Sequence, residues 1–270
     1  MNRKRMTALL LSTVMAVTPV MPAMAEQQTV TAVYADDADA TVTVKDPVAL
    51  SEKKTGWETV KGVKYYYENG KKVTNKAKKI GKYMYCFDKN GKLVTNKPYY
   101  KVNSNTYYRI KKNGKATRLS TVETMAAIRL QLCKGDLKKA FKWSASIQYK
   151  GNVAVSKKTP TEYGLYGFRN GYGDCYVMAS TFYWMAKVAG YDSHYVKGYF
   201  QKSKGKGAHA WVEIDQKAGG KTKTYVYDPN FQQEYGLNGY KLTYGAPICS
   251  VTVLYCPGRP FRRRWEAMRL

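Results

Sequence analysis

The sequence predicts an all-β module of hairpin repeats followed by an α+β domain in which a helix packs on an antiparallel sheet. Two observations support this. An aromatic-rich motif with an Asn-Gly pair recurs three times within residues 56–118. Beyond residue 119, segments with helical spacing precede three strand-like segments separated by Gly-, Lys- and Gln-rich turns.

Residues 1–25 have the pattern of a secretory signal peptide. A basic start precedes an apolar run from Met6 to Val20, and Ala23-Met24-Ala25 supplies small residues for cleavage before Glu26. The apolar run is too short to span a bilayer comfortably, so we expect export to a bacterial cell surface without stable membrane insertion. Residues 26–55, rich in Ala, Thr, Val and Asp, are expected to be a flexible linker.

The charge and the cysteines narrow the function classes. The formal net charge is +27, and it is +24 without the three basic residues of the predicted signal peptide. In an exported protein, this favours a wall polymer such as teichoic acid or an acidic glycan over nucleic acid, although a generally basic surface explains it equally well. Five cysteines without a CxxC pair, and only two histidines, give no reason to expect a zinc site or another cofactor. The odd cysteine count leaves at least one thiol free.

The pairing of the other cysteines stays open at this stage. The candidate pairs are Cys86 with Cys133 and Cys249 with Cys256. Cys249 lies in a predicted terminal strand over 248–255 and Cys256 directly follows it, so the two are expected to point to opposite faces.

The three copies of the motif contain Asn69-Gly70, Asn90-Gly91 and Asn113-Gly114, and these pairs recur at intervals of 21 and 23 residues. Asn-Gly between aromatic-rich runs favours a type I′ turn, in which both residues have positive φ, so each copy predicts one β-hairpin. A single hairpin is marginal in water. The copies are therefore expected to stack on one another.

The pattern Gly56-Trp57…Tyr66-Tyr67…Asn69-Gly70…Thr74 resembles the cell-wall-binding (choline-binding-type) repeats of Gram-positive surface proteins. The resemblance implies that aromatic rings of adjacent copies hold a choline ammonium or a sugar. The alternative is that these rings only form the core of the repeats. Lys79 and Tyr100 stand where later copies of the family pattern carry Trp, which disfavours choline itself. The candidate wall-binding residues are Trp57, Tyr66, Tyr67, Tyr85, Phe87, Tyr100, Tyr107 and Tyr108.

A domain boundary is predicted at residue 119, with the second domain over 119–258 and a basic tail over 259–270. Ser120 and Glu123 have the spacing of a capping box. The run that follows predicts a helix up to Leu132, and its helical spacing predicts an apolar face of Val122, Met125, Ile128 and Leu132. A second helix is predicted over 136–145.

The segment Gly173-Asp174-Cys175 predicts the start of a further helix, which ends before Gly190, a favourable residue just past a helix end. Asp174 is placed to cap this helix, and Cys175 then lies in its first turn. The partial positive charge of a helix N-terminus favours a thiolate over a thiol. Cys175 is therefore the candidate nucleophile.

The three strand-like segments, over 194–200, 209–214 and 224–227, predict an antiparallel meander. His209 begins the second strand, and Asp228 follows the third. Adjacent antiparallel strands can bring these two side chains together at one end of the sheet. We expect His209 to accept the thiol proton and return it to a leaving amine, and Asp228 to orient the imidazole.

The order Cys175, then His209-Ala210-Trp211-Val212, then Tyr227-Asp228-Pro229 resembles the bacterial transglutaminase-like superfamily. The resemblance implies a papain-like α+β fold and an oxyanion site formed by the backbone N–H of the cysteine and an upstream donor. Candidates for that donor are Tyr166, Gly167 and Tyr172, and the sequence does not choose among them.

The function expected from these features is acyl transfer at peptide or isopeptide amide bonds through a cysteine thioester, with net hydrolysis by a cysteine peptidase or amidase. A protein-cross-linking transglutaminase is the main alternative. An arylamine-type acyltransferase needs an acyl donor that is hard to supply outside the cell. A non-catalytic wall-binding scaffold is the third alternative, which the three intact triad residues argue against.

Overall fold

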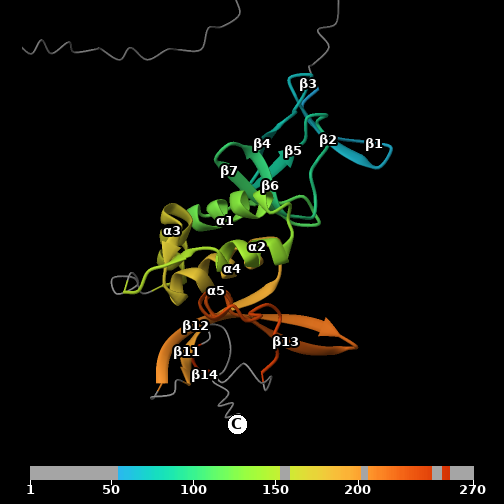
Figure 1. Ribbon diagram of the computed structural model, residues 1–270. Helices are drawn as coiled ribbons and strands as arrows, with labels where there is room; N and C mark the ends of the chain where they lie inside the picture. Colours follow the sequence, from blue (N-terminus) through green and yellow to red (C-terminus); the bar gives the residue numbers. More distant parts are fainter. Residues whose placement is uncertain (1–53, 153–158, 202–205, 245–250, 256–270) are drawn as a thin grey trace, which may run out of the picture. The chain divides into compact units, whose positions relative to one another are not determined.

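The computed structural model describes residues 54–152, 159–201, 206–244 and 251–255 (Figure 1). They belong to a compact unit over Ser51–Leu270. The predicted signal peptide, almost all of the predicted linker, Cys249, Cys256 and the basic tail lie outside the described residues. Within the described ranges, no helix is long and apolar enough to cross a membrane.

The hairpin module contains two antiparallel sheets, with strand orders β1-β2-β3 and β4-β5-β8-β7-β6. Its strands are β1 (Gly56–Val60), β2 (Val63–Glu68), β3 (Lys71–Lys72), β4 (Lys76–Ile80), β5 (Tyr83–Phe87), β6 (Lys97–Asn103), β7 (Thr106–Ile110) and β8 (Ala116–Arg118). In β5 the aromatic residues Tyr83, Tyr85 and Phe87 alternate along the strand.

The turns confirm the predicted type I′ conformation in one copy and contradict it in two. Asn69 and Gly70 both have positive φ, 51° and 75°, so this pair forms the expected I′-type turn between β2 and β3. Gly91 also has positive φ, 78°, but Asn90 does not, and the Asn113-Gly114 turn repeats this pattern. The type I′ prediction was wrong for these two copies. The Asp88 carboxylate accepts hydrogen bonds from the Asn90 and Lys92 amides and so favours a loop one residue longer, which needs only the glycine in the left-handed region.

Each copy packs against the one before it. A Cβ on Gly91 would lie 2.5 Å from the Lys72 side chain, and one on Gly114 would lie 2.9 Å from the Leu93 side chain. A Cβ at either position would have to displace the neighbouring side chain, and both glycines also have positive φ, which favours glycine. Backbone hydrogen bonds link the copies in the same way, because the Leu93 amide donates to the Lys64 carbonyl at 2.9 Å.

The third copy also packs against the helices that follow it. Tyr107 is buried in one hydrophobic cluster with Leu119 and Val122, and its hydroxyl donates to Gln131 Oε1 at 2.8 Å. Arg109 forms an ion pair with Glu123 at 3.0 Å. The boundary at residue 119 stays a prediction, but apolar packing and hydrogen bonds continue across it.

Beyond the boundary lies an α+β fold, which confirms the predicted class (Figure 1). The helices are α1 (Thr121–Leu132), α2 (Leu137–Ala145), α3 (Pro160–Asn170), α4 (Cys175–Ala189) and α5 (Pro229–Tyr235). The strands are β9 (Gln148–Tyr149), β10 (Tyr172–Gly173), β11 (Asp192–Gln201), β12 (Lys206–Ala218), β13 (Lys221–Tyr227) and β14 (Val251–Tyr255). Strands β13-β12-β11-β14 form an antiparallel sheet, and β9 pairs with β10 in parallel.

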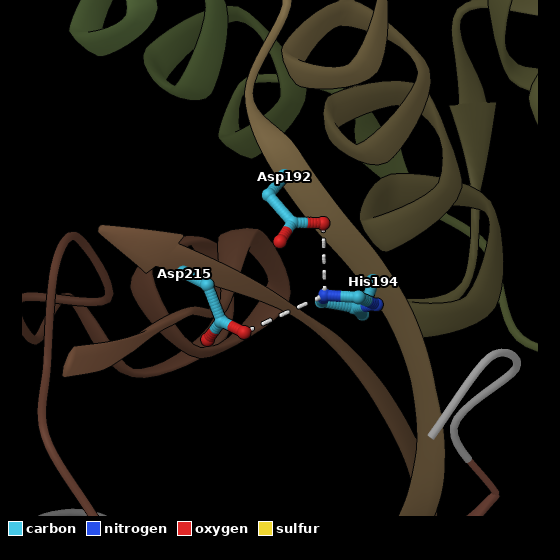
Figure 2. Close-up of side chains that lie close together, drawn as sticks. All are labelled: Asp192, His194 and Asp215. Carbon is cyan, nitrogen blue, oxygen red and sulfur yellow. Dashed lines mark ion pairs between the residues drawn. The ribbon is translucent and has the colours of Figure 1, made fainter. Parts of the chain in front are cut away.

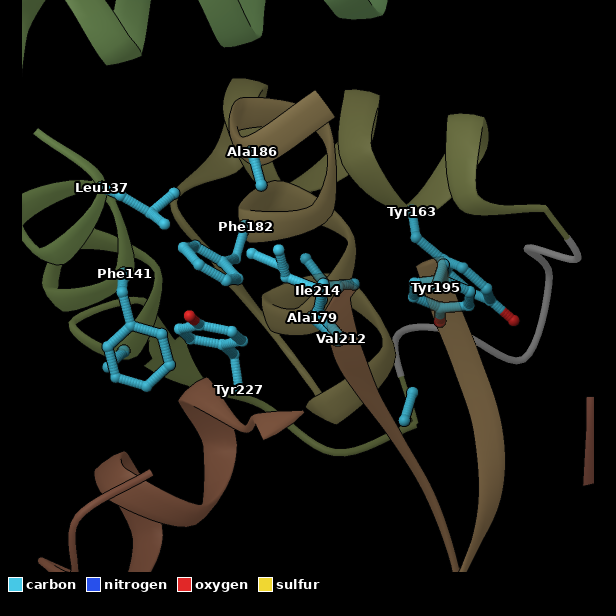
Figure 3. Close-up of a cluster of buried hydrophobic side chains, with 13 residues drawn as sticks. Leu137, Phe141, Tyr163, Ala179, Phe182, Ala186, Tyr195, Val212, Ile214 and Tyr227 are labelled. Atoms are coloured by element: carbon cyan, nitrogen blue, oxygen red, sulfur yellow. The ribbon is translucent and has the colours of Figure 1, made fainter. Parts of the chain in front are cut away.

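Helix α4 packs on β11 and β12 through the main core of this fold (Figure 3). Phe182 of α4 meets Phe141 of α2 edge-on at 5.2 Å and Tyr227 of β13 at 5.3 Å. One face of α4 is fully buried, namely Val177, Met178, Phe182, Met185 and Val188. The packing of α4 on the sheet fixes where its first residue, Cys175, is placed.

The capping box of α1 is confirmed, because the Ser120 and Glu123 side chains each accept from the other's backbone amide. Its predicted apolar face is only partly confirmed, because Val122 is buried but two of the other three residues are exposed. Ile128 and Leu132 are exposed, at 37% and 67%, while Leu130 is buried with two alanines of α1. The small alanines allow α4 and the third copy to approach α1 closely, which a count of large apolar residues does not reveal.

Candidate active site

Cys175 is the first residue of α4, as predicted, and is 7% exposed. Gly173 makes the tight approach to the helix possible, because a Cβ there would lie 2.5 Å from the Val177 side chain. The left-handed Gly190, with φ 96°, ends the helix. The Cys175 side chain is therefore held at the positive end of a helix of 15 residues.

Asp174, which precedes the thiol, caps the helix with its carboxylate. Its Oδ1 accepts hydrogen bonds from the amides of Tyr176 at 3.1 Å and Val177 at 3.3 Å. These bonds satisfy two of the amides that begin the helix. They also disperse the charge of Asp174, which would otherwise oppose a thiolate at Cys175.

His209 and Asp228 meet at one end of the sheet. His209 lies on β12 opposite Gly198 of β11, and Asp228 directly follows β13. His209 Nε2 and Asp228 Oδ2 are 2.6 Å apart, and both residues are 5% exposed. The other ring nitrogen, Nδ1, remains for Cys175, whose side chain shares a hydrogen bond with His209. The structure thus brings together the three residues predicted to form the site, while their catalytic roles stay a prediction.

The charges around His209 favour its protonated form. Burial alone would lower the pKa of His209, but the charge and hydrogen bond of Asp228, together with Cys175, raise it to about 10. At neutral pH the imidazole is therefore a cation that lies between a carboxylate and the cysteine. A neighbouring imidazolium stabilises a cysteine thiolate.

Asp228 has a second role that the sequence analysis missed. It is the N-cap of α5, and its Oδ1 accepts from the Phe231 amide at 2.9 Å while its Oδ2 contacts His209. Its own amide donates to the Gly239 carbonyl at 2.8 Å. A Cβ on Gly239 would lie 2.1 Å from the Asp228 carbonyl oxygen, so only glycine fits there. Gly239 therefore fixes the backbone that carries the carboxylate.

Tyrosines surround the candidate nucleophile. The rings of Tyr163 and Tyr176 lie 5.5 Å apart, and those of Tyr163 and Tyr195 lie 6.2 Å apart. Burial and the charges of Cys175 and its neighbours raise the pKa of Tyr176 to about 12. Lys197 lies over the rings of Tyr163 and Tyr176, at 5.0 and 5.5 Å from their centroids, and burial lowers its pKa. Aromatic surface with one cationic group beside it thus borders the cysteine.

The upstream oxyanion candidates are placed as follows. Gly167 lies inside α3, packed on Thr181 and Val177, so its amide serves the helix. Tyr166 and Tyr172 share a hydrogen bond between their side chains, and their rings meet edge-on at 5.6 Å. The Asp174 cap accepts from the Tyr176 and Val177 amides and so does not occupy the Cys175 amide, the other expected oxyanion donor.

The predicted wall-binding residues separate into three groups. Trp57 is 41% exposed, and the rings of Tyr66, Tyr85 and Phe87 lie 5.3, 5.0 and 5.9 Å from it. These four, which we call the Trp57 cluster, come from two adjacent copies. Phe87 is buried, at 1% exposure, so its ring supports the cluster and does not face a polymer. Tyr67 instead lies near Lys54, at 5.2 Å from its ring centroid. The other three lie in hydrophobic clusters, with Tyr100 partly buried and Tyr107 and Tyr108 buried, so the last two rings do not face a polymer.

Three cysteines within the described residues are free, namely Cys86, Cys133 and Cys175. Cys86 and Cys133 therefore do not pair. Burial raises the pKa of Cys86 to about 12 and also raises that of Cys133, so both thiols are poor nucleophiles at neutral pH. Cys249 and Cys256 lie outside the described residues.

A comparison with protein families finds a match within the α+β fold. The family model of the Transglutaminase-like superfamily matches residues 126–220, which include Cys175 and His209 but end before Asp228. Enzymes of this superfamily typically use a cysteine, so the match supports a thiol enzyme in general terms. A search of the curated proteins finds no match to this chain.

Solved structures similar to parts of the chain fall into two kinds. A choline-binding domain from Streptococcus pneumoniae has 20% sequence identity and a TM-score of 0.22, over 24% of this chain and 84% of that one. The modular Cpl-1 endolysin, solved with a peptidoglycan analogue, has 26% identity and a TM-score of 0.21, over 23% and 18%. A candidate cysteine protease from Cytophaga hutchinsonii has 13% identity and a TM-score of 0.34, over 54% and 55%.

Proposed function

We propose that this protein is an exported thiol enzyme of the bacterial cell surface that hydrolyses peptide or isopeptide amide bonds through a thioester on Cys175. The observation that carries the proposal is the placement of Cys175, at a helix start and hydrogen-bonded to His209, which in turn lies 2.6 Å from Asp228. A nucleophile, a proton carrier and an orienting carboxylate are the parts that acyl transfer needs.

The proposed reaction has two steps. The Cys175 thiolate attacks the amide carbon, the backbone amide of Cys175 donates to the oxyanion, and the C–N bond breaks as His209 gives its proton to the leaving amine. The acyl group is then a thioester on the sulfur. In the second step His209 takes a proton from water, the hydroxide adds to the thioester, and the C–S bond breaks. A carboxylic acid and the starting thiolate result.

Water is proposed as the acceptor because the site lies in a small fold. Transamidation requires that water be excluded and a neutral amine be held beside the thioester. The described residues carry no domain beyond the hairpin module and the α+β fold that could build such a tunnel. Cross-linking therefore remains the second candidate reaction.

The test uses the mature chain, residues 26–270, with peptidoglycan stem peptides, glutamine-containing proteins and a large excess of a primary amine. Mass spectrometry counts the hydrolysed and aminated products. Cys175→Ala is expected to abolish both products, whereas the matched control Cys133→Ala, which removes another buried thiol, retains them. Predominance of the aminated product at millimolar amine would make cross-linking the better description. Turnover by Cys175→Ala would exclude the thioester route.

We further propose that the hairpin module holds the enzyme to a wall polymer, a glycan or a teichoic acid, through the Trp57 cluster. The partly exposed Trp57 ring, with aromatic rings from two copies around it, is suited to stack on a sugar or to hold a cation. Trp57→Ala should lower sedimentation with purified walls. Tyr83→Ala, a similarly exposed aromatic residue outside this cluster, should not. Equal loss in both variants would indicate that the anchor is only the basic surface.

A further inference from the structure

A second group of potential ligands lies at the opposite end of α4 from Cys175. It consists of Asp192 and His194 on β11 and Asp215 on β12 (Figure 2). His194 Nε2 is 3.3 Å from Asp192 Oδ1 and 3.8 Å from Asp215 Oδ2. All three ligand atoms lie within 4.8 Å of one another, and Figure 2 shows both carboxylates directed toward the His194 ring nitrogen.

The register of the sheet creates this group. Asp192 pairs with Asp215 directly across the two strands, and His194 follows Asp192 by two residues and so shares its face. β11 begins just after α4 ends, and α4 is 15 residues long. At 1.5 Å per residue, this separates the group from Cys175 by about 22 Å along the helix. The group is therefore distinct from the candidate active site.

Two carboxylates directly opposite each other on neighbouring strands destabilise a sheet unless a cation lies between them. One carboxylate is already oriented, because Asp215 Oδ1 accepts a hydrogen bond from Thr224 at 2.7 Å, and its Oδ2 faces His194. A polar partner of this kind, behind a ligand, is typical of metal sites. Glu213, directly across from His194, is engaged elsewhere by the Tyr244 hydroxyl.

We propose that Asp192, His194 and Asp215 bind one zinc ion. An imidazole nitrogen with carboxylate oxygens is a ligand set that suits Zn²⁺, and an all-oxygen set would suit Ca²⁺ or Mg²⁺ better. Bonds of about 2.0–2.1 Å in a tetrahedron place neighbouring ligand atoms roughly 3.3 Å apart. The contact with Asp192 already has this spacing, at 3.3 Å, and the contact with Asp215, at 3.8 Å, needs to close by about half an ångström.

The exposure of the three side chains gives the ion an entry path. The side chains of His194 and Asp215 are each 15% exposed, whereas that of Asp192 is 72% exposed. Two ligands are thus held by the sheet, and the third can swing in from solvent when the ion arrives. Water completes the fourth position on the open side. The ion joins the ends of β11 and β12, so its effect is on stability and not on turnover.

The test titrates metal into the mature chain without an affinity tag, in a Cys175→Ala background that removes the thiol of the candidate active site. Calorimetry is expected to find one Zn²⁺ per chain, and zinc to raise the Tm relative to chelator-treated protein. Co²⁺ used as a probe should give the strong visible absorption of a four-coordinate ion. The variant His194→Gln should lose all three signals, as should Asp192→Asn, an exposed substitution that does not threaten folding.

Glu234→Gln is the matched control, because it removes an exposed carboxylate of α5 that lies outside the group. It should bind zinc like the parent chain. Three results would overturn the proposal. The first is the absence of a heat of binding, and the second is binding that persists in both Asp192→Asn and His194→Gln. The third is a Tm that changes with the protonation of these residues but does not change when zinc is added. In the last case the group is only an ion pair of a protonated histidine.

Discussion

The two histidines lie near opposite ends of α4, and they differ in what surrounds them. His209 is buried, with one carboxylate at 2.6 Å and the candidate nucleophile on its other side. His194 has two carboxylates at 3.3 and 3.8 Å, and the nearer one is largely in solvent. A histidine beside an aspartate is therefore no sign of catalysis in itself. Burial, and the group on the second ring nitrogen, distinguish a proton carrier from a metal or ion-pair ligand.

The difference between His209 and His194 is tested most directly by the same substitution at both residues. His209→Gln removes the proton carrier and is expected to lower turnover on the order of 10⁴-fold, as loss of a triad member does. His194→Gln should leave turnover unchanged. Both variants are measured on the same soluble peptide, with circular dichroism as the control for folding. If the two substitutions lower turnover equally, the assignment of the two ends is wrong.

Substitutions of the carboxylates test whether a neighbouring charge sets the pKa of each histidine. Asp228→Asn keeps a side chain that can cap α5, but it removes the charge that raises the pKa of His209 to about 10. Burial then dominates and the pKa falls. We expect a loss of activity on the order of 10²- to 10⁴-fold at neutral pH, with the alkaline limit of the remaining activity moved to lower pH. Asp215→Asn, at the other end, should shift neither.

Asp228→Asn should also change how the free energy of unfolding depends on pH, and the direction follows from the pKa of His209. The folded pKa of His209, about 10, lies above the unfolded value of about 6.5. The stabilisation from its pairing is therefore complete below pH 6.5 and is lost as the pH rises through 10. Urea unfolding of the parent chain between these limits should show a falling free energy that Asp228→Asn does not show. Parallel curves for the two proteins would contradict the charged pair.

Some of this arrangement was predictable from sequence because its signals are local. Gly173, Asp174 and Gly190 mark the ends of α4, so the place of Cys175 in its first turn followed directly. The proximity of His209 and Asp228 followed from the short meander, since adjacent antiparallel strands bring one end of each together.

Other parts depended on contacts that the sequence does not display. Helix α3 was missed although Thr159, Pro160 and Glu162 give it a capping box and an N-terminal proline. Its glycines read as helix breakers, yet a Cβ on Gly164 would lie 2.6 Å from Trp184, so close packing requires them. The zinc ligand group was not foreseen either, because its members adjoin only once the strand register is known.

Helix α5 was also missed, and it offers a test of how accurately Asp228 must be placed. Gly239→Ala would put a Cβ 2.1 Å from the Asp228 carbonyl, so the backbone that carries the carboxylate must move. We expect about 1–3 kcal/mol of lost stability and roughly a tenfold or greater fall in turnover, because small displacements of catalytic groups are costly.

The control for Gly239→Ala is Gly236→Ala, at the C-terminus of α5. Gly236 has φ +67° with nothing within 4 Å of its added Cβ, so alanine costs about 1 kcal/mol through backbone strain alone. This variant should lose stability while keeping its turnover. If both variants lose turnover in proportion to stability, the close approach at Gly239 is structural and does not position the carboxylate.

The smallest effect on turnover is expected where the third hairpin copy supports the C-terminal half of α4. Tyr107 is buried in one cluster with Trp184, Met185 and Val188 of that half. Tyr107→Ala should leave turnover at low temperature unchanged, because Cys175 lies at the other end of the helix. It should lower stability by about 3–5 kcal/mol and the Tm by roughly 10 °C, through the cavity and the lost hydrogen bond to Gln131.

Tyr83→Ala, which changes an exposed tyrosine of the same module, is the control and should barely change the Tm. Equal Tm values for the two variants would mean that the module and the α+β fold are separable at residue 119. A lower Tm for Tyr107→Ala alone would place the folding boundary before β6, so a stable fragment would have to begin near Lys97.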